Sequence, residues 1–330
     1  MKELIRKLTQ AYGPSGREAG VRDIIRAEIG KIGEARVDAL GSLIVHLPGK
    51  GGGKKVMLAA HMDEIGVVIT HVDQKGFLRF ANVGGVHAMP LHGSRVQFAG
   101  GLVGVIGMEK LDDPSRTPGL DKFYIDVGAD EKNPPGVKVG DIACFSRPFE
   151  EMGNRLVAKA MDDRIGCAIL VQVLKGLKKS PHDLFFVFTV QEEVGLRGAA
   201  ASAFGVEPEL ALAVDITVTG DTPECAPMSV RLGAGPAIKV KDSGMIAHLG
   251  VKDWLVRTAE ACAVPYQFEV LTMGSTDAMA MQTSRAGVPA GCLSIATRYA
   301  HSPSEMLDYG DVQNAVKLLD AALTGPIDIG

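Results

Sequence analysis

The run KKVMLAAHMDE, residues 54–64, decides the fold class. Its centre, residues 56–60, is apolar at every position, which is typical of a strand buried on both faces of a sheet. His61 and Asp63 follow directly, so polar side chains stand where this strand ends. In open α/β sheets, ligands bind beyond the carboxyl ends of the strands. The run therefore predicts an α/β domain with a functional site at that edge of its sheet.

Strands and helices alternate on both sides of this run, which predicts a largely parallel sheet covered by helices on both faces. Further strands are expected at 35–38, 43–47, 184–190, 210–214, 267–271 and 288–295. Helices are expected at 3–12, 17–32, 164–179, 243–263, 276–286 and 310–323.

A stretch of different character interrupts the alternation. Between residues 67 and 157, short β-type runs are separated by Gly, Pro and Asp turns, and no helix is expected. The predicted fold class is therefore α/β, with a mostly parallel mixed sheet sandwiched by helices and interrupted by a small, barrel-like all-β domain. Residues 1–66 and 158–330 would form the α/β domain, and residues 67–157 the inserted one.

The composition is that of an ordinary globular protein, with 46% hydrophobic residues, 22% charged residues and a net charge of −4. This balance gives no indication of nucleic acid or an anionic membrane as a partner. No apolar run reaches the roughly 18 residues of a membrane-spanning helix, and the N-terminus lacks the apolar core of a secretory signal. The five cysteines form no CxxC pair and are interpreted as reduced thiols of the core. We therefore expect a cytoplasmic protein.

Three other predicted strands also run into residues that can bind a metal. The sheet would gather these residues at one edge, although they are far apart in the sequence. They are Glu192 and Glu193 after 184–190, Asp215 after 210–214, and His301 a few residues beyond 288–295.

Two adjacent carboxylates, Asp162 and Asp163, stand where the chain enters the helix expected at 164–179. Taken alone, an Asp at this position is readily interpreted as a helix cap. Together with the strand-end residues, it becomes a candidate ligand. The residues themselves do not decide whether Asp162 or Asp163 is that ligand.

The number of carboxylates favours two metal ions over one. Asp162, Asp215, Glu192 and Glu193 would repel one another in a half-buried crevice, and several would take up protons. Two divalent cations supply four positive charges, which three ligating carboxylates and a bridging hydroxide would balance. Histidine nitrogen and carboxylate oxygen suit zinc, with cobalt or manganese as alternatives.

Two residues are candidates for supporting roles. Asp63 is on the same side of an extended strand as His61, where its carboxylate could orient the ring. In the Glu192–Glu193 pair, one carboxylate could bind metal and the other take a proton from the activated water. Each motif alone also has a simpler interpretation, as a polar strand end or as two solvated glutamates. Arg164 and Arg298 flank the motifs, where they could bind substrate or a ligand carboxylate, or form surface pairs.

Over essentially its full length, the chain resembles the tetrahedral aminopeptidases, the glutamyl and deblocking aminopeptidases of bacteria and archaea. The ordered set of motifs is far more specific than any one of them. In sequence order they are LTQAYGPSGRE, AAHMDEIGVVI, YIDVGA, VGD, AKAMDDRIGC, FTVQEEVGLRGA, AVDITVTGDTP, STDA and TRYAHSPSEM.

The resemblance implies an aminopeptidase that hydrolyses the N-terminal bond of peptides with a free N-terminus, through a hydroxide that bridges two metals. It also implies that the inserted domain serves dimerisation, that the subunits assemble into tetrahedral dodecamers, and that the Asp162–Asp163 peptide is cis. The implied roles are His61 and Asp215 on one metal, Glu193 and His301 on the other, Asp162 as the bridge, Glu192 as the general base and Asp63 as the partner of His61.

One departure from the family pattern stands at Met273-Gly274-Ser275, before Thr276-Asp277-Ala278, where a glycine-rich run is expected. It puts the side-chain preference of the substrate pocket in question.

Three other functions compete with this prediction. An amino-acid deacylase or carboxypeptidase would use the same ligands. A glycosidase could pair Glu192 or Glu193 with Asp215 and would need no metal. A non-catalytic assembly module could retain the metal site for structural reasons.

Overall fold

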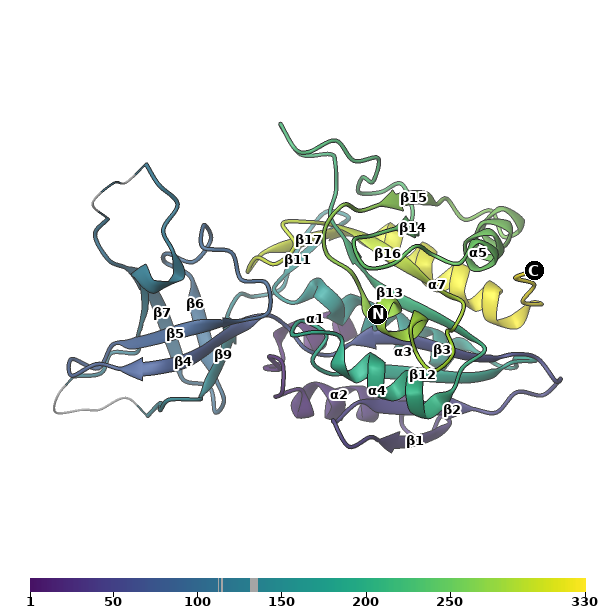
Figure 1. Ribbon diagram of the computed structural model, residues 1–330, viewed down its shortest axis with the longest axis horizontal. Coiled ribbons are helices and arrows are strands. Elements are labelled where there is room, and N and C mark those ends of the chain that lie inside the picture. The colour runs from purple at the N-terminus through teal and green to yellow at the C-terminus, as the bar shows by residue number, and fades with distance from the viewer. Residues whose placement is uncertain (112, 114, 131–135) are drawn as a thin grey trace.

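The structure is a computed structural model that describes residues 1–111, 113, 115–130 and 136–330. It has two bodies, a large α/β body and a smaller β-barrel beside it (Figure 1). Within the described residues, no helix combines the length and the apolar character needed to cross a bilayer.

Four parallel strands form the centre of the large sheet. Because parallel strands point the same way, their carboxyl ends meet at one edge. In spatial order they are β12 (Asp183–Thr189), β3 (Lys55–His61), β13 (Leu210–Thr217) and β16 (Ala290–Arg298).

The flanks of the same sheet add antiparallel pairs, so the sheet is mixed, as predicted. On one side lie β2 (Leu43–Leu47) and β1 (Glu34–Val37). On the other lie β17 (Glu305–Asp308), β11 (Arg155–Ala158) and β10 (Glu150–Met152). β14 (Ala237–Lys241) pairs with β16, and β15 (Gln267–Val270) pairs with β14.

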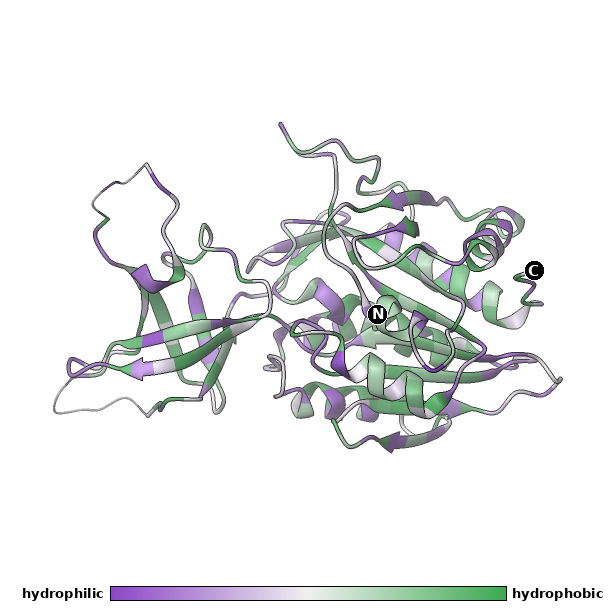
Figure 2. Cartoon of the chain, in the orientation of Figure 1, coloured by the Kyte–Doolittle hydropathy of each residue, from purple (hydrophilic) through white to green (hydrophobic). Residues whose placement is uncertain are grey.

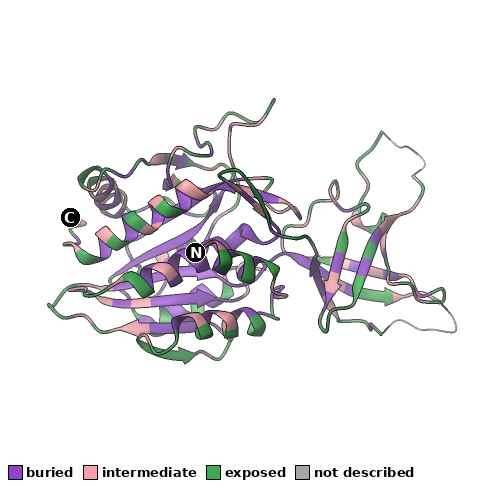
Figure 3. Cartoon of the chain, turned by 180° about the vertical axis from the view of Figure 1, so that it is seen from behind, coloured by how far each residue is buried: buried purple, intermediate pink, exposed green. Residues whose placement is uncertain are grey.

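Helices cover both faces of the sheet, and alternate residues of β3 show how. Val56 and Leu58 pack in the cluster that includes α1, α2, α3, α5 and α7, whereas Met57 and Ala59 face α4 and α6. The central strands are apolar and buried, as their sequences predict (Figures 2 and 3). The helices are α1 (Lys2–Gln10), α2 (Ala19–Ile29), α3 (Met161–Gly176), α4 (Arg197–Val206), α5 (Leu249–Ala261), α6 (Asp277–Gln282) and α7 (Tyr309–Thr324).

The smaller body is a closed barrel with its own apolar core. Its strands, in order around the barrel, are β4 (Gly66–Val72), β5 (Leu78–Val83), β8 (Phe123–Asp126), β7 (Val103–Met108), β6 (Arg95–Phe98) and β9 (Ile142–Phe145). A short 3-10 helix (Leu120–Lys122) precedes β8. β10 and β11 fall within the range predicted for the inserted domain, but they pair with the large sheet through β17.

Some elements differ from the sequence predictions. The patterns do not predict α4, whose sequence RGAAASAFGV has small residues in place of an apolar stripe, or the short strands β10, β11, β14 and β17. The helix expected from residue 243 begins only at Leu249. The Asp242 carboxylate accepts hydrogen bonds from the amides of Gly244 and Met245, at 2.9 and 2.7 Å, and this holds a turn where the helix was expected.

The cysteines follow the prediction only in part. All five are free, and Cys144, Cys167 and Cys292 are buried in the core. Cys225 and Cys262 are partly exposed, although Cys262 packs against the core of the large body.

Candidate metal centre

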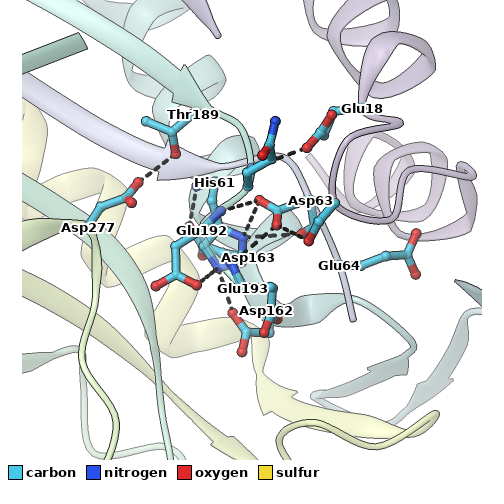
Figure 4. Close-up of polar contacts among 12 residues, drawn as sticks. Glu18, His61, Asp63, Glu64, Asp162, Asp163, Thr189, Glu192, Glu193 and Asp277 are labelled. Atoms are coloured by element: carbon cyan, nitrogen blue, oxygen red, sulfur yellow. Dashed lines mark hydrogen bonds and ion pairs between the residues drawn. The ribbon is translucent and has the colours of Figure 1, made fainter. Parts of the chain in front are cut away.

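The carboxyl ends of the central strands bring the predicted ligands together. His61 ends β3, Asp215 lies in β13, Glu193 follows β12 and His301 follows β16. Asp162 reaches the same place from the start of α3 (Figure 4). The edge of the sheet predicted from the apolar runs is therefore where the candidate ligands meet.

Asp162 lies between the two histidines. Its Oδ1 is 2.9 Å from His61 Nε2, and its Oδ2 is 3.2 Å from His301 Nε2. Glu193 Oε2 is 3.7 Å from the same His301 nitrogen. One carboxylate thus contacts two imidazoles through different oxygens, which is the geometry that a bridging ligand needs.

The other ring nitrogen of each imidazole, Nδ1, lies within hydrogen-bonding distance of a backbone carbonyl oxygen. His61 Nδ1 lies 3.2 Å from the Asp63 carbonyl oxygen, and His301 Nδ1 lies 2.9 Å from the Gly85 carbonyl oxygen. Because each Nδ1 is engaged by a carbonyl oxygen, Nε2 is the nitrogen of each ring that is left for a metal ion beside Asp162. At Gly85 a Cβ atom would lie 2.5 Å from His301 Nδ1, so a side chain there would displace the ring.

Two sets of donor atoms have metal-site spacing. The donors of His61, Asp162 and Glu193 lie within 4.8 Å of one another, and so do those of His61, Asp163 and Asp215. These nitrogen and carboxylate oxygen donors match the preferences of zinc and similar divalent ions.

The two adjacent aspartates differ in what their oxygens contact, and the peptide bond between them is cis, as the resemblance implies. Asp163 accepts hydrogen bonds from the His61 amide at 3.1 Å and the Gly166 amide at 3.0 Å, one on each oxygen. Asp162 instead directs its oxygens at the two histidines.

The centre holds more negative charge than its own histidines can balance. Burial, reinforced by the charge of Asp162, raises the pKa of both Glu193 and Asp215 to about 8. Burial also raises the pKa of Glu192 well above its usual range. Burial would lower the pKa of His301, but the hydrogen bond to Asp162 and the charge of Glu193 outweigh it and raise this pKa to about 10. Divalent cations would supply the missing positive charge, so the residues present fit such ions.

Asp63 contacts more than the ring that it was expected to orient. Its Oδ1 lies 3.5 Å from His61 Nδ1, a long contact. The same carboxylate accepts hydrogen bonds from the amides of Glu192 at 3.0 Å and Glu193 at 3.2 Å, and from the Ser15 hydroxyl at 2.6 Å. It therefore supports the turn that carries both glutamates as well as His61.

Sequence reasoning missed a second buried carboxylate that supports ligands. Glu305 accepts hydrogen bonds from the His301 amide at 2.8 Å and the Asp162 amide at 3.0 Å. It therefore fixes the backbone of two candidate ligands. The signal was present in the motif TRYAHSPSEM, where Glu305 follows His301 by four residues.

Neither of the two arginines near the motifs pairs with a candidate ligand in the contacts of the described residues. Arg164 is fully buried and donates to the carbonyls of Leu8 at 2.6 Å and Gly13 at 3.1 Å, and to Glu64 at 3.1 Å. The expectation of a surface or ligand-pairing role for Arg164 is therefore wrong. Arg298 pairs with Asp221 at 2.9 Å.

Comparisons with known proteins find aminopeptidases that match nearly the whole chain. The chain is 33% identical to the lysyl aminopeptidase of Pyrococcus furiosus, over 97% of this chain and 96% of that one. It superposes on an aminopeptidase from Desulfurococcus kamchatkensis with a TM-score of 0.93 and 42% identity, covering 98% of this chain and 94% of that one. The chain also superposes on the TET1 peptidase of Pyrococcus horikoshii with a TM-score of 0.88 and 34% identity, covering 98% of each chain. That peptidase can assemble into a tetrahedron or a large octahedral shell. Residues 41–318 match the family described as M42 glutamyl aminopeptidase, and the chain belongs to that family.

Proposed function

We propose that this aminopeptidase removes the N-terminal residue of peptides with the help of two divalent metal ions. One observation carries the proposal: the two oxygens of Asp162 lie 2.9 and 3.2 Å from the Nε2 atoms of His61 and His301. A carboxylate whose two oxygens each lie beside an imidazole Nε2 atom is suited to hold a pair of ions.

In the proposed assignment, one ion is held on each side of Asp162. Asp163 is left out because both of its oxygens already accept hydrogen bonds from backbone amides. Zinc is the proposed metal, with cobalt and manganese as alternatives, since the donors are nitrogen and oxygen. The ligands are His61 and Asp215 on one side, Glu193 and His301 on the other, and Asp162 between them.

Glu192 is the proposed general base. Its carboxylate lies near the ligands without being one of them, with Oε2 3.9 Å from His61 Nε2. When bound, the ions would polarise the scissile carbonyl and lower the pKa of the attacking water. Glu192 would accept the proton of that water and deliver it to the departing amine. Asp63 accepts a hydrogen bond from the Glu192 backbone amide, and this bond would keep the Glu192 side chain near the attacking water.

Self-association is also proposed, first to dimers through the barrel and then to dodecamers of tetrahedral form. The barrel carries exposed apolar side chains on and beside β7, at Leu102, Val103 and Val105, which are 37%, 45% and 47% exposed. Clustered apolar surface of this kind is typical of protein interfaces.

The proposal is tested by loading metal-free protein with zinc, cobalt or manganese, counting the bound ions and assaying a substrate panel. We expect two ions per subunit and hydrolysis of aminoacyl anilides with a free amine, but not of their N-acetylated forms. Preference for N-acyl amino acids would indicate a deacylase instead. Hydrolysis of polysaccharide in strong chelator would indicate a glycosidase. No hydrolysis of any peptide after loading would favour a non-catalytic module.

A further inference from the structure

The segment AYGPSGRE, residues 11–18, lies against the turn that carries Glu192. From the contacts below we infer that Ser15 and Glu18 are positioning residues, which hold this turn in its catalytic shape. The inference rests on the proposed function, because it concerns the placement of the proposed base.

The turn is held through three consecutive backbone amides. The Gln191 amide donates to Glu18 Oε1 at 3.1 Å, and the next two amides, of Glu192 and Glu193, donate to the Asp63 carboxylate. Gln191 has a φ of 56°, in the left-handed region that a residue other than glycine adopts only when its surroundings support it. Successive amides of this kind form a binding site for anionic oxygen, and here two carboxylates of the chain itself fill it (Figure 4).

Ser15 fixes the second of these carboxylates. Its hydroxyl donates to Asp63 Oδ2 at 2.6 Å, and Asp63 is fully buried. Without this donor, Oδ2 would keep only the 3.2 Å bond from the Glu193 amide among its hydrogen bonds to the described residues. The carboxylate could then rotate, which would move the Glu192 amide and its side chain together.

Glu18 is itself tightly placed. Its Oε1 also accepts from the Gly16 amide at 2.7 Å, so the carboxylate joins its own loop to the catalytic turn. Glu18 and Ser15 are 5% and 6% exposed, so water has little access to either side chain.

Buried groups hold the segment from the other side. The carbonyls of Ala11 and Gly13 accept hydrogen bonds from Lys159 and Arg164, both at 3.1 Å. The Tyr12 hydroxyl donates to the Ile142 carbonyl of β9 at 2.9 Å, which joins the segment to the barrel. Ser15 and Glu18 therefore project from a fixed support, as positioning groups must.

The test compares Ser15→Ala and Glu18→Ala with two matched controls outside the centre. Ser202, also buried, donates to the Asp38 carboxylate at 3.0 Å, so Ser202→Ala removes the same kind of bond. Asp311, also buried, accepts from the amides of Gly233 and Gly235, both at 2.7 Å, so Asp311→Ala removes an acceptor of two backbone amides, as Glu18→Ala does.

For the two test variants we expect kcat to fall by about tenfold or more, with the metal content unchanged. KM for an aminoacyl anilide should stay within about twofold, because the loss concerns the base and not substrate binding. The controls should keep kcat although they lose thermal stability. Ser15→Thr, which keeps the hydroxyl, should recover most of the lost kcat. Glu18→Gln should keep more kcat than Glu18→Ala, because its amide oxygen can accept both bonds that Glu18 Oε1 accepts.

Unchanged kcat in Ser15→Ala and in Glu18→Ala, in protein whose wild type is active, would overturn the inference alone. An equal loss of kcat in test and control variants would overturn it as well, since the effect would then be one of general stability. A wild type without activity on any aminoacyl substrate would overturn the proposed function itself.

Discussion

At the scale of single residues, the candidate metal centre depends on two kinds of buried carboxylate. One kind contacts the histidine rings, and the other accepts hydrogen bonds from backbone amides. Asp162, Asp163 and Glu305 are all buried within the same small region. The first contacts two imidazoles, whereas the other two accept from backbone amides. From the sequence, the two aspartates could be named but not told apart, and Glu305 was missed. The contacts that distinguish these carboxylates come from segments remote in the sequence.

The first residue-scale prediction concerns the proposed base. Glu192→Gln keeps the size of the side chain and removes its ability to accept a proton. We expect the variant to bind both metal ions and to lose about 10²- to 10⁴-fold in kcat. Metal analysis and steady-state kinetics on one preparation check this. Normal turnover in Glu192→Gln would remove Glu192 as the base.

The second residue-scale prediction concerns thiol reactivity. Burial raises the pKa of Cys144 to about 12, and the pKa values of Cys167 and Cys292 lie well above the usual range. At pH 8 these groups would be almost entirely in the unreactive thiol form, and the thiolate is the nucleophile. A disulfide reagent should therefore modify only Cys225 and Cys262 in the native protein, and all five cysteines after denaturation. Rapid labelling of a third site under native conditions would contradict this.

At the scale of elements, the sequence predicts the buried strands best. An all-apolar run as short as residues 56–60 is typical of a strand with both faces covered, and its position along the chain also locates the site. β14 and β17 carry no such signal, because each is short and mixes apolar with charged residues. They become strands by pairing with β16, a partner that local sequence does not reveal.

An element-scale prediction follows from Arg164, which joins α3 to the N-terminal segment. Arg164→Met would leave the Leu8 and Gly13 carbonyls without this donor in a buried place. We expect the free energy of unfolding to fall by about 3–5 kcal/mol, as for other broken buried pairs. Denaturant unfolding measures this change.

The matched control is Arg285→Met, since Arg285 forms a pair with Glu207 in which the side chains are 40% and 60% exposed. Loss of this exposed pair should lower the free energy of unfolding by less than about 1 kcal/mol. Equal effects in the two variants would show that Arg164 is no more important to stability than a surface arginine.

At the scale of the whole molecule, the prediction concerns association through the barrel. Val103 and Val105 lie two residues apart on β7, so their side chains point the same way, and both are exposed. Changing both to Asp should shift the assembly toward monomers in light-scattering mass measurements, while circular dichroism stays unchanged. Val37→Asp, at an exposed valine of β1 in the α/β body, is the control and should not separate the barrel contacts. A double variant with the wild-type mass would rule out this face of the barrel.

The hydrogen bond between Gly85 and His301 has a consequence for regulation. Gly85 lies in the loop between β5 and β6, so the barrel contacts the His301 ring while β17 of the large sheet holds the His301 backbone through Glu305. If neighbouring subunits hold the barrel in place, dissociation of a subunit would also loosen the ring of His301 in the proposed catalytic centre. A peptide-degrading particle built in this way would lose its hydrolytic power as it falls apart, which would protect other proteins from stray subunits.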